Sequence, residues 1–197
     1  GDTPFYQCTK GFHNALQGTP VHIGDDLLHE YERTNAENAE RLRPVLEDAD
    51  VVFIHDPQPA PLLGLMPERK GKWVWRCHID LSNPNGELWE YLRAFVNRYD
   101  AMIISGEDYR QEVDIPQLVF YPAINPFSIK NRHMSQEEVD ERLDHYDIPR
   151  DLPIVCQVSR FDRWKDPEGV IQAFKIARKK VDATLILLGN FAPDDPE

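Results

Sequence analysis

Three short apolar stretches of this chain end abruptly in polar residues of kinds that bind or transform ligands. The first ends in His55 and Asp56, the second in Arg76, His78 and Asp80, and the third in Ser159, Arg160 and Lys165. A short apolar run is the pattern of a buried parallel strand, and parallel sheets bind their ligands at the carboxyl ends of the strands. We therefore expect these three groups to line a cleft.

The third group is suited to binding an anion. Its strand, Ile154–Val158, is followed by a polar turn, and Asp166-Pro167 then opens a helix, so Arg160 and Lys165 would lie beside a helix N-terminus. A guanidinium offers a planar fork to two oxygens and an ammonium a mobile point charge, which together suit a diphosphate. Both groups can stabilise charge growing on a leaving phosphate. The chain has no Gly-x-Gly-x-x-Gly and no P-loop signature.

Structural alternatives stay open for each group. His55 could be a satisfied histidine at a strand end, Arg76 could be buried in a structural ion pair, and Asp56 could cap the helix that follows it. Arg160 and Lys165 could be surface charges at a turn. Each residue type alone is compatible with these interpretations, so the prediction rests on the three groups together.

The histidines and aspartates also form two patterns, His55-Asp56 and His78-x-Asp80, that could ligate a metal ion. A zinc site needs three or four protein ligands, and no third and fourth ligand follows at helical spacing. We therefore expect no metal and no cofactor.

Alternating helices and strands would position these residues. We predict helices at residues 5–16, 25–46, 58–65 and 84–99 and from Glu107, and strands at residues 50–55, 73–78, 101–105 and 118–121. Thr9 is expected to cap the first helix and Gly18 to end it. Alternation of this kind predicts an α/β fold with a parallel sheet and right-handed crossovers.

The pattern changes after residue 126. A charged helix begins at Ser135-Gln-Glu-Glu138, which is typical of a capping box, and one βαβ unit follows with strands at 154–158 and 184–188. We predict part of an N-terminal Rossmann-like domain in residues 1–126, an interdomain crossover in 127–152, and the first βαβ unit of a C-terminal domain in 153–197. Roughly 45 residues are too few for an independent domain, so both domains are expected to be incomplete in this chain.

Composition narrows the class of protein. The 197 residues are 41% hydrophobic and 28% charged, as in globular proteins, and the net charge of −12 argues against a general nucleic-acid binder. No apolar stretch reaches the roughly 18 residues of a membrane span, so we expect no membrane partner. Cys8, Cys77 and Cys156 lie far apart, and the last two are in apolar runs. We predict buried free thiols and a cytoplasmic protein.

Several motifs resemble those of a known family. Ser159-Arg-Phe-Asp-Arg-Trp-Lys-Asp166, followed by a helix and Leu-Ile-Leu-Leu-Gly189, resembles the retaining glycosyltransferases of family 4, which have two Rossmann-like domains in the GT-B arrangement. Within that family, four segments look like the branch of trehalose glycosyltransferring synthases. They are His13-Asn-Ala-Leu-Gln-Gly18, His55-Asp-Pro-Gln-Pro59, Trp75-Arg-Cys-His-Ile-Asp-Leu-Ser82 and Ser159-Arg-Phe-Asp162.

The resemblance implies roles for single residues. Arg160 and Lys165 match the pair that binds the donor diphosphate and supports catalysis, and His78 matches the histidine that contacts the transferred sugar. Asp56 matches a carboxylate on the acceptor side, with Arg76 and Asp80 as further candidates for sugar binding. The family's Gly-rich loop would lie before Gly1 and its Glu-x7-Glu donor motif after Glu197. Ile124-Asn125-Pro126 stands where many relatives carry an aspartate.

The implied activity is transfer of glucose, with retention, from a nucleoside-diphosphate glucose to free glucose, which gives α,α-trehalose reversibly. The implied partners are these three sugars, and a homo-oligomer is open. Two alternatives remain: another family 4 glycosyltransferase with a different acceptor, and a non-catalytic fragment that binds nucleotide sugars. We expect the 197 residues alone to be inactive.

Overall fold

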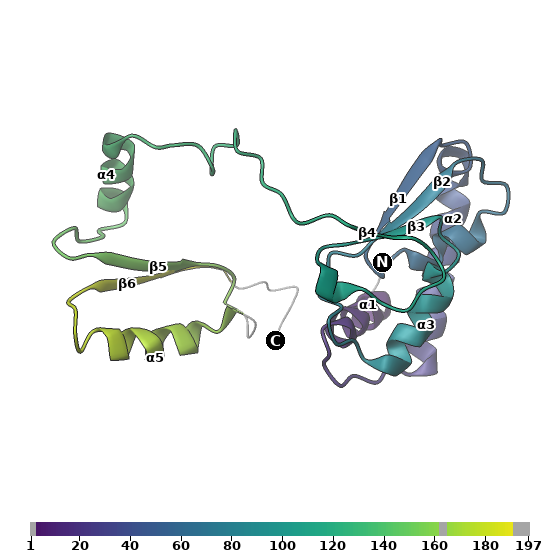
Figure 1. Ribbon diagram of the computed structural model, residues 1–197, viewed down its shortest axis with the longest axis horizontal. Coiled ribbons are helices and arrows are strands. Elements are labelled where there is room, and N and C mark those ends of the chain that lie inside the picture. The colour runs from purple at the N-terminus through teal and green to yellow at the C-terminus, as the bar shows by residue number, and fades with distance from the viewer. Residues whose placement is uncertain (1–2, 162–164, 191–197) are drawn as a thin grey trace. The chain divides into compact units, whose positions relative to one another are not determined.

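The computed structural model describes residues 3–161 and 165–190 (Figure 1). The chain divides into two compact units, unit 1 at Gly1–Ile124 and unit 2 at Asn125–Glu197. Each unit is described by itself below. In the described part of the chain, no helix combines the length and the apolar character that a membrane crossing requires.

Unit 1 is built around a four-stranded parallel sheet. Its strands are β1 (Val51–His55), β2 (Lys72–Arg76), β3 (Ala101–Ile104) and β4 (Gln117–Val119), and they pair in the order β1-β2-β3-β4. Because strand order follows chain order, right-handed crossovers carry each connection over the same face of the sheet. The predicted α/β fold with a parallel sheet is confirmed. The pairing register places His55 opposite Arg76, so β1 and β2 end side by side.

Helices pack against that face of the sheet. They are α1 (Thr3–Leu16), α2 (Asp25–Leu46) and α3 (Gly86–Val96), with short 3₁₀ helices η1 (Ala60–Leu65) and η2 (Glu107–Tyr109) in the connections. The prediction that Thr9 caps the first helix is wrong, because Thr9 is buried inside α1 and its hydroxyl donates to the carbonyl of Tyr6. Such a bond lets threonine sit inside a helix.

Gly18 ends the first helical segment, as predicted. Its φ is +87°, in the left-handed region that favours glycine. A Cβ at this position would lie 2.8 Å from the carbonyl oxygen of Asn83. A larger residue would therefore strain the turn that leads from α1 to α2 and push against the segment before α3.

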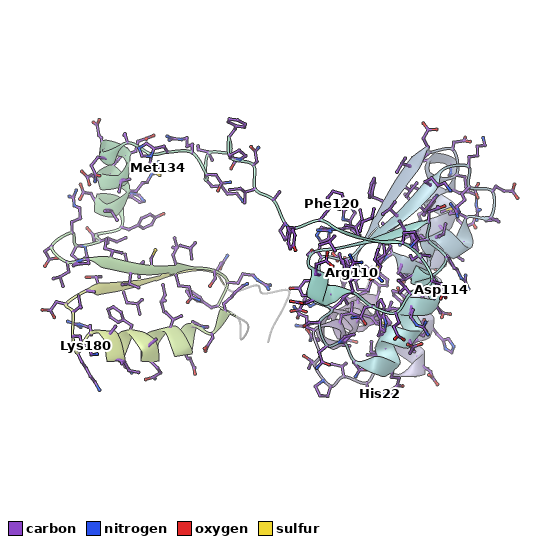
Figure 2. All side chains as sticks on the ribbon, in the orientation of Figure 1. His22, Arg110, Asp114, Phe120, Met134 and Lys180 are labelled. Carbon is purple, nitrogen blue, oxygen red and sulfur yellow. The ribbon has the colours of Figure 1, made fainter. Side chains whose placement is uncertain are left out.

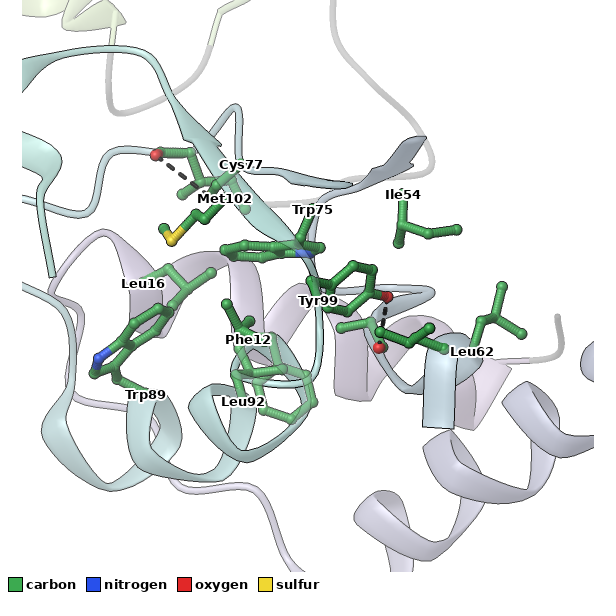
Figure 3. Close-up of a cluster of buried hydrophobic side chains, with 14 of the residues drawn as sticks. Phe12, Leu16, Ile54, Leu62, Trp75, Cys77, Trp89, Leu92, Tyr99 and Met102 are labelled. Carbon is green, nitrogen blue, oxygen red and sulfur yellow. Dashed lines mark hydrogen bonds between the residues drawn. The ribbon is translucent and has the colours of Figure 1, made fainter. Parts of the chain in front are cut away.

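The core of unit 1 lies between the sheet and the helices (Figure 3). The largest fully buried side chains include Trp73, Trp75, Tyr31 and Phe12. Aromatic side chains of this size bury about 150–250 Å² each and dominate such cores. The hydroxyl of Tyr31 donates to the carbonyl of Pro57 at 2.5 Å, and that of Tyr99 donates to the carbonyl of Ala60 at 2.8 Å. These two bonds fix the segment that directly follows His55 and Asp56.

The opposite face of the sheet carries apolar side chains that stay exposed. Along β1, exposed and buried positions alternate with the strand period of two. Val51 and Phe53 are each 54% exposed, and Phe120, labelled in Figure 2, is 59% exposed. No described element buries these side chains, so unit 1 has one packed and one open sheet face.

Unit 2 contains one charged helix and one βαβ unit. Its elements are α4 (Gln136–His145), β5 (Ile154–Val158), α5 (Pro167–Ala177) and β6 (Thr184–Leu188), and β5 pairs with β6 in parallel. The capping box before α4 is confirmed. The Ser135 hydroxyl accepts from the backbone nitrogen of Glu138, and the Glu138 carboxylate accepts from the backbone nitrogen of Ser135.

The prediction that Cys156 is a buried thiol is wrong, whereas apolar positions of β5 stay exposed, as expected for an incomplete domain. β5 is not a buried strand, since Val155 is 47% and Val158 71% exposed, and Cys156 is exposed as well. The reason is that a sheet of two strands with one helix buries few of its apolar positions. The prediction of buried thiols holds in unit 1, where Cys8 and Cys77 are buried free thiols. Burial raises the pKa of both to about 12.

Candidate functional site

Asp56 is the residue at which the chain leaves β1, and three neighbours hold it. Its backbone nitrogen donates to the carbonyl of Arg76, and its carbonyl accepts from the indole Nε1 of Trp75, both at 2.8 Å. Its Oδ1 accepts from the backbone nitrogen of His78, also at 2.8 Å. These contacts keep Asp56 in a left-handed conformation with a φ of +62°.

A left-handed backbone costs a residue other than glycine about 1–3 kcal/mol, and such strain concentrates at functional sites. The left-handed backbone of Asp56 directs its carboxylate across the edge of the sheet toward β2. The alternative that Asp56 caps the following helix is wrong, because η1 follows Pro59 and has no side-chain cap. The sequence pattern is compatible with both roles, and the conformation of Asp56 decides between them.

His55 and His78 meet at the ends of the two neighbouring strands. Nδ1 of His55 lies 2.8 Å from Nε2 of His78, and both side chains are exposed. The two imidazoles thus lie within hydrogen-bonding distance of each other, and the Asp56 carboxylate is bonded to the backbone of His78 at the same carboxyl edge of the sheet. Groups of this kind can accept and donate hydrogen bonds to the hydroxyls of a sugar.

Arg76 is buried beneath this edge. Its guanidinium donates to the carbonyl of Ile104 at 2.9 Å, to the hydroxyl of Ser105 at 3.1 Å and to the carbonyl of Phe120 at 3.0 Å. The alternative for Arg76 was burial in a structural ion pair. Arg76 is indeed buried, but its partners are neutral oxygens rather than a carboxylate. This geometry favours a role in holding β2, β3 and the chain after β4 together over the sugar-binding role predicted from the sequence.

Asp80 lies two residues beyond His78 and belongs to a turn. Its Oδ1 accepts from the backbone nitrogen of Ser82 at 2.7 Å. The negative charge of Asp80 is also the main reason why the pKa of Tyr109 is raised. Within the described residues, Asp80 forms no hydrogen bond with His55 or Asp56. The structure therefore brings His55, Asp56 and His78 together and leaves Asp80 at the margin.

In unit 2, Arg160 and Lys165 lie where they were predicted, in the connection from β5 to α5. Asp166 caps α5 with its side chain, and the carbonyl of Lys165 accepts from Nε2 of Gln157 at 2.6 Å. The side chains of Arg160 and Lys165 are exposed. Residues 162–164, which belong to the same motif, lie outside the described residues. Lys165 directly precedes the N-cap of α5, and a helix N-terminus favours an anion.

Metal binding was the remaining alternative for the histidines and aspartates. Over residues 3–161 and 165–190, no three His, Cys, Asp or Glu side chains gather in a way that could hold a metal ion. The pair formed by His55 and His78 was not predicted, although both residues were recognised as polar strand ends. The available signal was that two adjacent strands in a predicted parallel sheet both end near a histidine.

Two successive α/β units of this kind also occur in solved structures, which the chain matches over nearly its whole length. The fold resembles a structure from E. coli, described as trehalose-6-phosphate bound with UDP-2-fluoro glucose, with a TM-score of 0.75 and 15% identity over 100% of this chain and 53% of that one. A UDP-forming trehalose-phosphate synthase from Burkholderia xenovorans in complex with glucose-6-phosphate gives a TM-score of 0.66 and 15% identity, with 97% and 50% covered.

Sequence comparison identifies the family. The family model described as "Trehalose synthase, N-terminal domain" matches residues 1–111, and the chain belongs to this family. Trehalose synthases from Thermococcus litoralis and Pyrococcus furiosus are 42% identical over 202 residues, and that of Rubrobacter xylanophilus is 39% identical over 206 residues. Each match covers 100% of this chain and 48% or 49% of the relative, so the chain spans about half the length of these relatives.

Proposed function

We propose that this chain forms the acceptor side, and the beginning of the donor side, of a retaining glucosyltransferase. The reaction joins glucose from a nucleoside-diphosphate glucose to free glucose and gives α,α-trehalose, reversibly. The carrying observation is the convergence of His55, Asp56 and His78 at the sheet edge of a trehalose synthase N-terminal domain. Because the chain covers only about half the length of its relatives, the activity of the whole protein is also part of the proposal.

The proposal assigns a role to each unit. Residues 1–126 form the acceptor-side domain, residues 127–152 the crossover, and residues 153–197 the first βαβ unit of the nucleotide-sugar domain. In unit 1, Oδ1 of Asp56 is bonded to the backbone of His78, and no described residue donates to Oδ2. That oxygen and the imidazole of His78 are the groups offered to sugar hydroxyls.

In unit 2, Arg160 and Lys165 bind the diphosphate of the donor. The bond from the anomeric carbon to the phosphate oxygen breaks, and the electron pair passes to the leaving nucleoside diphosphate, where the two cations stabilise it. The acceptor hydroxyl forms the new bond on the same face of the sugar. Bond formation on that face retains the configuration. The proton of the acceptor hydroxyl passes to an oxygen of the leaving phosphate, so the charges balance.

The test is an assay of the protein that the whole gene encodes, with UDP-, ADP- or GDP-glucose as donor and ¹³C-labelled glucose as acceptor. We expect labelled α,α-trehalose, identified by NMR, together with release of the nucleoside diphosphate. The His78→Ala variant is the matched control and should lose transfer. Transfer only to glucose 6-phosphate, only to another acceptor, or to no acceptor at all would contradict the proposal.

A further inference from the structure

The contact between His55 and His78 has a geometry that determines its chemistry. The ring planes are nearly parallel, at 9°, and the ring centroids are 5.1 Å apart, while Nδ1 of His55 and Nε2 of His78 are 2.8 Å apart. The centroid separation equals the N–N distance plus the distance from centroid to nitrogen in each ring. This is the largest centroid separation that the contact allows. Both nitrogens must then lie on the line that joins the centroids, and the two rings are coplanar rather than stacked face to face.

Coplanar rings point the two nitrogens directly at each other, which is the arrangement of a linear N–H···N hydrogen bond. A neutral imidazole has one nitrogen that donates and one that accepts, so one proton lies between the rings. If His55 were the donor, both rings would carry their proton on Nδ1, the less favoured tautomer of a free imidazole. If His78 is the donor, both rings carry it on Nε2, the favoured tautomer.

The backbone of His78 is fixed as well, because its nitrogen donates to Oδ1 of Asp56. The last residue of β1 and the residue after it thus both hold His78, His55 at the ring and Asp56 at the backbone. With Nε2 engaged, the remaining ring nitrogen of His78 is Nδ1, with which no described residue forms a hydrogen bond. In the favoured tautomer this Nδ1 carries a lone pair and no proton.

We propose that His55 is a positioning residue, which fixes the ring and the tautomer of His78 so that Nδ1 of His78 accepts a hydrogen bond from a sugar hydroxyl. This inference rests on the proposed function for its ligand, whereas the pair itself does not depend on that function. A misplacement of about 1 Å in such a group can cost about 10²-fold in rate. His55 therefore contributes to turnover without touching the sugar.

The first test is spectroscopic and uses the protein that the whole gene encodes, with ¹⁵N-labelled histidine. We expect a scalar coupling across the hydrogen bond between Nδ1 of His55 and Nε2 of His78, and an unprotonated Nδ1 in His78. The coupling should vanish in His55→Leu, and the His78 ring should then show both tautomers. A wild-type chain without the coupling, or with the proton on Nδ1 of His78, would overturn the inference.

The second test uses the reach of two amide side chains in the protein that the whole gene encodes. An asparagine at position 55 places its amide oxygen near the position of the imidazole Nδ1, whereas a glutamine places it one methylene farther out. We expect kcat of His55→Asn to stay within about threefold of wild type, and kcat of His55→Gln and His55→Leu to fall by about tenfold or more, with a smaller change in KM. Equal kcat in all three variants would refute the positioning role. A wild-type protein without trehalose synthesis would instead refute the proposed function. The scalar coupling would still test whether His55 and His78 are hydrogen-bonded to each other.

Discussion

Replacing Arg76 by methionine should destabilise unit 1 strongly, because the guanidinium joins three segments of the chain. Methionine keeps much of the apolar stem and removes the three hydrogen bonds to Ile104, Ser105 and Phe120. Each such bond contributes about 1 kcal/mol net, which gives about 3 kcal/mol in total. The carbonyl of Ile104 still accepts from the backbone nitrogen of Phe120 at 2.9 Å, so it is not left unsatisfied. We therefore expect a loss of about 2–3 kcal/mol.

The matched control is Arg110→Met. Arg110, labelled in Figure 2, is exposed, and its main partner is the carboxylate of Glu107 one helical turn away. A surface pair of this kind contributes under about 0.5 kcal/mol. The free energy of unfolding would be measured with guanidinium chloride and tryptophan fluorescence, since three of the four tryptophans lie in unit 1. Equal stability of the two variants would show that Arg76 does not hold the sheet edge together.

Four further outcomes are expected. Arg160→Ala in the protein that the whole gene encodes should lower turnover by about 10²-fold or more at unchanged stability, and near-normal turnover would contradict the diphosphate role. Lys165→Arg should not keep full turnover with saturating donor, because a fork and a point charge differ in reach; equal rates would indicate a surface charge. Although burial opposes the shift, hydrogen bonds from Lys72, Trp73 and Arg69 lower the pKa of Asp100 to about 2. Asp100 therefore stabilises the fold above its unfolded pKa of about 4, and the stability difference between wild type and Asp100→Asn should shrink from pH 5 to pH 2; a constant difference would refute this. Amides of β5 should exchange with solvent faster than those of β2, which is flanked by two strands, and equal protection of the two strands would be the contrary result.

Most elements of the fold could be predicted from local patterns. Short apolar runs located every strand of unit 1 to within about two residues, because a strand in a packed sheet must place apolar side chains on the core. Asp166-Pro167 and Ser135-Gln-Glu-Glu138 located two helix starts, because side-chain caps act within a few residues of sequence. Thr9 was misplaced because a threonine hydroxyl can bond to a backbone carbonyl inside a helix as well as cap one.

Burial was harder to predict than secondary structure. Cys77 and Cys156 lie in equally apolar runs, yet one is buried and the other exposed. An apolar run reports what a strand can bury, whereas actual burial depends on which elements cover each face. Unit 1 brings three helices onto one face of its sheet, and the opposite face keeps Phe53 exposed. The difference between the two faces of this sheet comes from the order of the strands and the hand of the crossovers, which no local pattern encodes.

The site combines local and non-local information in a way that explains which part of it was predictable. That His55, Asp56 and His78 would reach one sheet edge follows from their places after apolar runs. Their contacts depend on the register that sets His55 opposite Arg76, and a slip by one residue would turn the His55 side chain to the other face. They depend also on the left-handed conformation of Asp56, which two hydrogen bonds with β2 and one with His78 maintain. The residues that carry chemistry are thus visible in the sequence, whereas the pairing of the imidazoles arises only when the two strands are aligned.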